Sequence, residues 1–402
     1  ASEKELSLSH RSEPRASGYK SYYDFHEAYK TGKKTPLEVA ERLLASIQLS
    51  QTGNQPLNAF LAWHRDDVLT QARASTERYS RRAWLSELDG VPVVVKDETD
   101  VQGYESLIGT AFVNRGSPAA QDACTVKKFR EKGAVIVGKS VMQELGWDST
   151  FSLNSTQGTP RNPYNLNHSC GGSSGGSACA VAAGFCPIAI GGDSGGSVRI
   201  PAAFCGVYAL KPTLGRISSR GGYPLGPSLE CQGPIACSAD DLAMAYWVMA
   251  GVDDEFPFRR GERGRIPLLD MDLVSHRDPS THLQPAPTLR GLRATASLAG
   301  VRVGVFPAWN SHVQNRAVTA RVADFVRALT EKGAEVVEIL IPELERAHVA
   351  HLVTLCAERS AFVGAMLGRR AGKSLTCSNR VLMRVSESLT AGVSAEWMHS
   401  GG

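Results

Sequence analysis

Hydrophobic and polar positions alternate along the chain in a pattern that predicts helices separated by short apolar strands. Thr35 and Glu38 form a capping box with Pro36 at the first helical position, so a helix should begin at Thr35. Apolar residues then recur at helical spacing on one face of this helix, at Leu37, Leu43, Leu44 and Ile47. Further helices are predicted at 126–132 and 316–332, and buried apolar strands at 91–95, 134–137, 301–306 and 336–341. This alternation predicts an α/β protein in which helices pack on a sheet.

A short sequence occurs twice at corresponding places in this pattern. Glu-Lys-Gly-Ala stands at 131–134 and again at 331–334, each time between a predicted helix and an apolar strand. Two similar helix–turn–strand units explain the repeat, and so does a chance similarity of two glycine-ended helices. Residues 1–20 are polar, and we expect them to be disordered. Residues 253–290 contain five prolines, many charges and little periodicity, so we expect an exposed connection there.

The composition narrows the class of protein. The chain has 402 residues, of which 42% are hydrophobic, enough for one large domain or two smaller ones. A formal net charge of +4 gives no reason to expect nucleic-acid binding. Nine cysteines without a C-x-x-C pair, several of them in apolar surroundings, predict reduced core thiols and a cytoplasmic location. No apolar run reaches the ~18 to 20 residues of a membrane-spanning helix, and the polar N-terminus lacks the apolar segment of a signal peptide. A peripheral membrane contact and a homodimer stay open.

Two glycine-rich serine clusters are the most informative feature of the chain. They occupy 171–177 and 191–197, and the small apolar run between them, Ala178 to Ile190, is expected to be buried. One core segment therefore ties the two serine-bearing loops together. Upstream, the apolar run 91–95 leads directly into Lys96. A buried lysine with two loop serines is an arrangement that activates a hydroxyl nucleophile without histidine.

Lys96 can act as a base only if its amine is neutral at working pH. Burial favours the neutral amine, whereas the neighbouring Asp97 opposes it if its carboxylate points inward. The competing interpretation is that Lys96 extends from a strand end into solvent. The glycines allow backbone N–H groups to converge on an oxyanion. A flexible linker and a phosphate loop are the alternatives, but both clusters adjoin apolar segments and no lysine follows either one.

The second cluster also contains the string that surrounds the nucleophile of trypsin-like proteases, Gly-Asp-Ser-Gly-Gly at 192–196. That interpretation would make Ser194 the nucleophile and requires a histidine base and an all-β barrel. Neither His64 nor His168 has the sequence setting of such a base. The predicted helices also argue against the barrel, so the match is treated as accidental.

Several motifs in order resemble the amidase signature family. The matching stretches are 90–97, 133–139, both glycine clusters, 199–206, 210–213, 215–218 and 233–236, which together cover residues from about 35 to 250. The stretches 192–201 and 336–345, the latter followed by Ala350 and His351, are most similar to the plant-type fatty acid amide hydrolases. The resemblance implies the amidase signature fold, a mixed twisted sheet with helices on both faces.

The resemblance also implies a role for each matching residue. Lys96 corresponds to the base, Ser173 to a proton-relaying serine on a cis peptide, and Ser197 to the nucleophile. An amide carbonyl would then be attacked by Ser197, and water would release the acyl group without any metal or cofactor. The family's oxyanion segment corresponds to Ser194, Gly195 and Gly196, with the amide of Ser197, and the supporting positions correspond to Ser174, Asp193 and Arg199.

Three activities fit this resemblance. The first is hydrolysis of a fatty acid amide or N-acylethanolamine-type substrate, which is lipid-like. The second is a general amidase for small amides. The third is the glutaminase (A) subunit of a tRNA-dependent amidotransferase, which works inside a multi-subunit complex. Near-neutral charge and the match at 342–345 favour the first.

The expected organisation is an N-terminal extension at 1–30 and a single amidase signature domain at 31–402. The family continues beyond His399 through a further apolar, glycine-rich segment, so we expect a truncated chain. Glu230 also stands where the family usually has aspartate. An inactive, truncated relative therefore remains a further alternative.

Overall fold

The fold was analysed in a computed structural model, which describes residues 20–147, 154, 156–223, 225–253, 297–367 and 375–399. Most of the polar N-terminal stretch and nearly all of the proline-rich connection predicted at 253–290 lie outside these residues. Asp253, at the start of that connection, is described: its carboxylate pairs with Arg220, with 2.9 Å between Arg220 Nε and Asp253 Oδ2.

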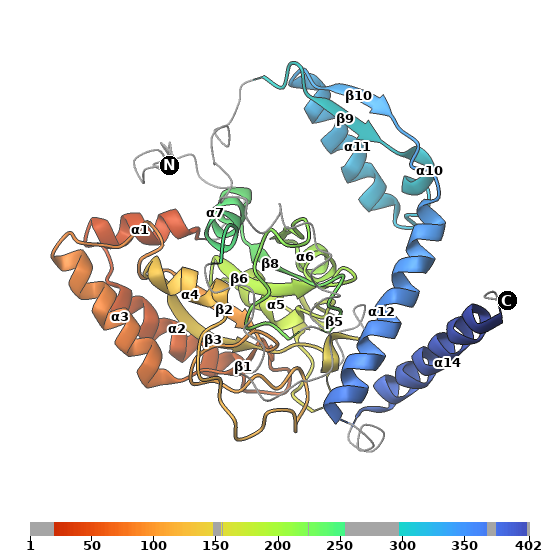
Figure 1. The fold of residues 1–402 in the computed structure, drawn as a ribbon. Coiled ribbons are helices and arrows are strands. Elements are labelled where there is room, and N and C mark those ends of the chain that lie inside the picture. The colour runs from red at the N-terminus through yellow and green to blue at the C-terminus, as the bar shows by residue number, and fades with distance from the viewer. Residues whose placement is uncertain are drawn as a thin grey trace.

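A six-stranded mixed sheet forms the centre of the molecule, with strand order β1-β3-β2-β6-β8-β7 (Figure 1). Strands β2 and β6 run parallel to each other, and β2 also runs parallel to β3. The pairs β1–β3, β6–β8 and β7–β8 are antiparallel. The strands are β1 (Phe60–Ala62), β2 (Pro92–Lys96), β3 (Val135–Ser140), β6 (Ile188–Asp193), β7 (Tyr208–Ala209) and β8 (Cys231–Ala236).

Helices cover both faces of this sheet. Successive strand residues point to opposite sides, so each face carries apolar side chains that pack against helices. Val93 and Val95 of β2 pack in one cluster with residues of α4 (Cys124–Glu131) and α7 (Ala239–Met249). Val94 packs on the opposite face, with residues of α2 (Pro36–Ser50) and α5 (Gly175–Ala182). The predicted α/β fold, with a mixed sheet between helices, is confirmed.

The N-terminal boundary differs from the prediction. Helix α1 (Tyr22–Lys30) falls within the expected extension at 1–30, yet Tyr22 is fully buried in the core beside the sheet. Its backbone N–H donates to Asp241 of α7 at 2.7 Å. The packed domain therefore begins before residue 31. A capping box at Ser21 starts α1, as the predicted box at Thr35 starts α2.

The predicted strands near 301–306 and 336–341 form outside the central sheet. They appear as β9 (Arg302–Val305) and β10 (Glu335–Glu338), which pair in parallel as a separate two-stranded sheet. Both strands are largely exposed, so their predicted burial was wrong. With α10 (Pro307–Asn310) and α11 (Arg316–Glu331) they form a small unit that Figure 1 shows apart from the central body.

Two long helices follow this small unit. Helix α12 (Leu344–Leu367) runs from it down beside the central body, and α14 (Cys377–His399) lies next to α12 (Figure 1). The second half of α12 is buried at Phe362 and Val363, which pack with Met142, Leu145 and Leu225. None of the helices in the described part of the chain is both long and apolar enough to cross a membrane.

All nine cysteine thiols are free, and eight of them are buried, as predicted for core cysteines; Cys377 is exposed.

The remaining elements are short or peripheral. The elements not yet named are α3 (Arg65–Ser80), the 3-10 turn η2 (Glu144–Gly146), β4 (Arg161–Asn162), β5 (Asn165–Ser169) and α6 (Arg199–Cys205).

Candidate active site

The candidate site lies where two parallel strands end at the same edge of the sheet. Strands β2 and β6 are direct neighbours, with Val95 opposite Ile190. Lys96 is the last residue of β2, and Asp193 is the last residue of β6. The apolar run Ala178–Ile190 is largely buried, as predicted, and it connects the first glycine cluster to the second through α5 and β6. The carboxyl ends of parallel strands are the usual location of sites in α/β proteins.

Lys96 is buried with 1% of its surface exposed, and its amine faces the first glycine cluster. Its Nζ lies 2.9 Å from Ser173 Oγ and 3.2 Å from the carbonyl oxygen of Gly192. A third neighbour is Glu98, whose Oε1 lies 2.9 Å from the same nitrogen. The alternative in which Lys96 extends into solvent is therefore wrong. The peptide bond between Gly172 and Ser173 is cis.

Ser174 joins the two glycine clusters. Its backbone N–H donates to the carbonyl of Ser197 at 3.1 Å, and its hydroxyl donates to the carbonyl of Gly192 at 3.3 Å. Ser197 itself is 1% exposed. The two serine-bearing loops thus lie side by side above the ends of β2 and β6, as the sequence predicted.

Asp193 holds the loop that carries Ser194 and Ser197. Its carboxylate accepts the N–H groups of Gly196 at 2.6 Å and Val198 at 3.2 Å. It also pairs with Arg199 through two contacts of 3.0 Å. Burial favours the protonated acid, but the guanidinium and the two N–H groups outweigh it, so the pKa of Asp193 lies below its usual range.

The predicted oxyanion segment has one donor already in use. The Gly196 N–H points at Asp193, so any oxyanion role falls to the other amides of this loop. Gly196 has a φ of +123°, a backbone conformation that side chains rarely adopt. Helix α12 covers the neighbouring Gly195, where a Cβ atom would lie 3.2 Å from Leu355 Cδ2 and 3.7 Å from His351 Nε2.

The carboxylate that faces Lys96 is that of Glu98, and the condition under which Asp97 would oppose a neutral amine is not met. Asp97 points away and accepts the N–H groups of Leu107 and Gly109 at 3.0 and 2.8 Å. Glu98 lies in the turn after β2, in which the Thr99 N–H donates to the Lys96 carbonyl at 3.0 Å, and this turn brings its carboxylate back to the Lys96 amine. Gly192 leaves room for Glu98, because a Cβ atom on Gly192 would overlap the Glu98 carboxylate.

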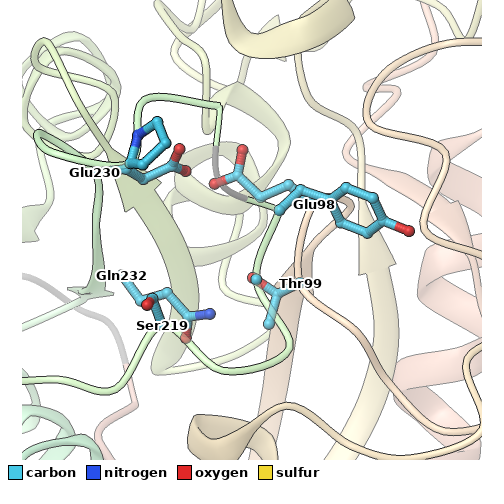
Figure 2. Close-up of a pocket in the computed structure, with 8 residues that line it drawn as sticks. Glu98, Thr99, Ser219, Glu230 and Gln232 are labelled. Carbon is cyan, nitrogen blue, oxygen red and sulfur yellow. The ribbon is translucent and has the colours of Figure 1, made fainter. Parts of the chain in front are cut away.

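Two further charged residues near the site were missed as functional candidates. Glu230 stands just before β8, and its carboxyl points toward that of Glu98 (Figure 2). Arg359 of α12 is buried and reaches Ser194 Oγ at 3.5 Å. Only the folded chain reveals this contact, since 165 positions separate the two residues.

A small pocket opens beside Glu98, with a cavity volume of about 30 Å³. The pocket is lined by Glu98, Thr99, Ser219, Gly222, Tyr223, Pro227, Glu230 and Gln232 (Figure 2).

Within the described ranges, no group of three histidine, cysteine or acidic residues is placed to hold a metal ion.

The protease interpretation of the second cluster fails on the fold and on the surroundings of Ser194. The chain forms a mixed α/β sheet rather than an all-β barrel. The Ser194 hydroxyl faces the Arg359 guanidinium. His64 stacks on Tyr104 with ring centroids 3.9 Å apart, and His168 lies on β5.

Fold and site together define an α/β protein with a buried lysine–serine pair between two glycine loops. Residues 41–399 match the Amidase family, and the chain belongs to this family. A fatty acid amide hydrolase of Medicago truncatula is 33% identical over 92% of this chain and 58% of its own length. The A subunit of the glutamyl-tRNA(Gln) amidotransferase of Chlorobium phaeobacteroides is 32% identical over 92% of this chain and 72% of its own length.

A similar solved structure is described in connection with the evolutionary origins of an s-triazine catabolic enzyme. It superposes with a TM-score of 0.76 at 31% identity, over 91% of this chain and 73% of the other. The chain spans 58% of the Medicago truncatula relative and 52% of a fatty acid amide hydrolase of Arabidopsis thaliana.

Proposed function

We propose that this chain hydrolyses carboxylic amides through Lys96, Ser173 and Ser197. The observation that carries the proposal is the 2.9 Å contact between Lys96 Nζ and Ser173 Oγ in a buried site. The hydrogen bond from the Ser174 N–H to the Ser197 carbonyl supports it, because it fixes the two loops together. Membership of the amidase family supports it independently.

The proposed reaction has two halves. Neutral Lys96 takes a proton from Ser173, which takes the Ser197 hydroxyl proton, and Ser197 Oγ bonds to the amide carbonyl carbon. Loop amides around Gly195 stabilise the oxyanion. The proton returns through Ser173 to the leaving nitrogen as the carbon–nitrogen bond breaks. Water then attacks the acyl-enzyme by the same relay and releases the carboxylic acid.

For the substrate we propose a fatty acid amide of the N-acylethanolamine type. Support comes from the similarity to plant proteins named fatty acid amide hydrolases, at 33% and 34% identity. The exposed ring of Phe204 on α6 lies beside the first glycine cluster, since a Cβ atom on Gly171 would be 3.2 Å from Phe204 Cδ2. Because a lipid-like substrate partitions into membranes, the proposal includes a peripheral membrane contact.

A second candidate is a small polar amide, as substrate of a general amidase or of a glutaminase subunit. The similarity to the A subunit of the glutamyl-tRNA(Gln) amidotransferase of Chlorobium phaeobacteroides, at 32% identity, supports it. Hydrolysis rates for primary amides of increasing acyl length separate the candidates. Rates that rise with chain length support the lipid substrate, whereas activity confined to short polar amides supports the second.

Labelling with a serine-directed fluorophosphonate, followed by peptide mass spectrometry, tests the catalytic assignment. We expect an adduct on Ser197 that is lost in Lys96→Ala and in Ser173→Ala. Ser177→Ala is the matched control, because Ser177 belongs to the same cluster and is equally buried. Its hydroxyl hydrogen-bonds Ser140 Oγ at 2.7 Å and the Ile190 carbonyl at 3.4 Å, and not the Lys96 amine.

The outcomes separate the alternatives. An adduct on Ser197 in the wild type and in Ser177→Ala supports the proposal. An adduct on Ser194 would contradict it in favour of the protease-like nucleophile. A chain that is folded by circular dichroism but takes no label would point to an inactive member of the family.

A further inference from the structure

Four charged side chains meet in the interior behind the proposed nucleophile. Lys96, Glu98 and Arg359 are each at most 2% exposed. Glu230 is partly exposed as a residue, but its Oε2 atom is buried and has no hydrogen-bond partner among the described residues. Burying this many charges together is costly unless they compensate one another, so their arrangement is informative.

Glu98 opposes the chemistry that Lys96 must perform. The Lys96 amine donates to Ser173 Oγ and to the Gly192 carbonyl, and it forms an ion pair with Glu98, whose Oε1 lies 2.9 Å from Nζ. A general base must instead be neutral, and a full negative charge on Glu98 stabilises the ammonium form. Something must therefore weaken that charge.

Glu230 is placed to do so. Its carboxyl points toward the Glu98 carboxyl from the loop before β8 (Figure 2). When two carboxyl groups face each other in a buried site, ionising both is energetically unfavourable, so the pair retains one shared proton. In keeping with this geometry, burial and the neighbouring Glu98 raise the pKa of Glu230 to about 8. A proton on Glu230, donated toward Glu98, reduces the negative charge that Lys96 experiences.

Arg359 supplies a countercharge to the pair from α12. Its guanidinium donates to the Gly146 carbonyl and reaches Ser194 Oγ at 3.5 Å. Burial lowers the pKa of Arg359, and the carboxyls of Glu230 and Glu98 oppose that effect. The titratable groups that face the pair and Arg359 come from β2, β3, β6, β8 and α12, namely Lys96, Lys139, Asp193, Cys231, Cys356 and Arg359.

We propose that Glu98 and Glu230 are positioning residues that share one proton and thereby set how firmly the ammonium form of Lys96 is held beside Ser173. The inference rests on the proposed function, in which Lys96 is the base. While Glu230 keeps the proton, Lys96 can lose its own to solvent and accept one from Ser173. When Glu230 ionises, Glu98 regains its full charge and Lys96 is held as ammonium.

The two carboxyl groups should therefore have opposite effects on the pH dependence of Ser197 labelling. Glu98→Gln removes the negative charge beside Lys96, so the acidic midpoint should move down by about one pH unit, with labelling about tenfold faster below it. Glu230→Met removes the donor to Glu98, so the midpoint should move up by about half a unit or more. Glu230→Gln keeps a donor and should leave the acidic midpoint unchanged.

Labelling rates of the full chain from about pH 5 to about pH 10 measure these midpoints. Glu144→Gln is the matched control: Glu144 is buried near the site but bonds Thr376 and Asn379 instead of Lys96. It should leave the midpoint in place. A purely structural role for the pair would change labelling amplitude or stability in all variants without opposite shifts. Ser197 labelling with an unmoved midpoint in Glu98→Gln would overturn this inference and leave the proposed function intact.

A stability measurement distinguishes failure of the shared-proton inference from failure of the proposed function. Glu230 has a raised pKa in the folded chain, so the stability that its proton contributes should be lost as pH rises from about 4.5 through about 8. Urea unfolding should show this loss in the wild type and not in Glu230→Gln. If the wild type takes no label at Ser197, the proposed function fails and the tuning of Lys96 fails with it. If the stability loss persists in Glu230→Gln, the shared proton is refuted even where labelling succeeds.

Discussion

At the scale of single residues, the carboxylate of Asp193 holds the loop that presents Ser197, although it takes no part in the proposed proton relay. It accepts two backbone N–H groups and pairs with Arg199. Asp193 is fully buried, whereas the Arg199 side chain is about half exposed. The loop geometry therefore depends on the anion more than on its cationic partner.

We expect Asp193→Asn to lower the free energy of unfolding by about 2–3 kcal/mol at neutral pH, because a neutral amide replaces a buried hydrogen-bonded anion. Labelling of Ser197 should slow at least about tenfold, since the loop amides lose their anchor. The Asp193 pKa is lowered on folding, so this stability is present above the unfolded value of about 4 and is lost as pH falls through the folded value. The wild type and the variant should converge at acidic pH in urea unfolding.

Asp122→Asn is the control for this prediction. Asp122 also pairs with an arginine, at 2.8 Å from Arg130 Nε, and also accepts a backbone N–H, that of Gln102 at 2.8 Å. It lies away from the glycine loops, so labelling should be unchanged. Equal slowing in both variants would contradict the special role of Asp193.

The residues of the candidate site differ in whether the neighbouring sequence alone points to them. Lys96 and the second serine cluster follow apolar runs directly, and the first cluster precedes one, so the sequence was enough to single them out. Glu98 was missed because only the adjacent carboxylate of Asp97 was considered, and the turn after β2 that brings Glu98 to Lys96 is visible only in the folded chain. Arg359 carries no local signal at all, because only the packing of α12 on the site brings it to Ser194.

At the scale of secondary-structure elements, helix α5 packs against the sheet without space for a side chain at one position. A Cβ atom on Gly176 would lie 2.5 Å from the carbonyl oxygens of Ala59 and Val141. Both contacts are to backbone, which cannot turn aside as a flexible side chain can. Gly176 therefore sets how closely α5, and with it Ser173, approaches β3.

Gly176→Ala should destabilise the chain by about 3 kcal/mol, because the added methyl overlaps backbone in a packed core. Gly364→Ala should have the opposite sign. Gly364 lies in α12 with open space around it, so alanine should stabilise the helix by about 0.5–1 kcal/mol. Thermal and urea unfolding of the two variants measure the difference. Destabilisation by both substitutions would contradict the contrast.

Helices were predicted correctly where a capping box or a glycine marks one of their ends. The capping box at Thr35 and the glycines at 133 and 333, with φ of +83° and +95°, end or begin helices as expected. Both Glu-Lys-Gly-Ala stretches do join a helix to a strand. Their strands differ in burial, however, because an apolar run does not tell which sheet it joins. Thus β3 is central and buried, whereas β10 pairs with β9 on an exposed two-stranded sheet.

At the scale of the whole molecule, the small unit around α11 leaves apolar side chains exposed. Val318, Val322 and Phe325 lie on one face of α11, with exposed fractions of 47%, 45% and 64%. Exposed apolar stripes of this kind mark contact surfaces in folded proteins. Figure 1 shows the unit apart from the central body, and Phe325 lies on α11, outside the part of α12 that contacts the glycine loops.

We therefore predict that, where two copies of the chain associate, they do so through this stripe on α11. Phe325→Glu should abolish concentration-dependent association in sedimentation velocity, because a charge in the middle of an apolar contact must be desolvated. The Ser197 labelling rate and the melting temperature should stay unchanged. Leu49→Glu is the matched control, since Leu49 is a singly exposed leucine on α2, 74% exposed. If both variants weaken association equally, the contact is a general effect of added charge rather than a property of α11. If neither does, the exposed stripe on α11 does not hold the copies together.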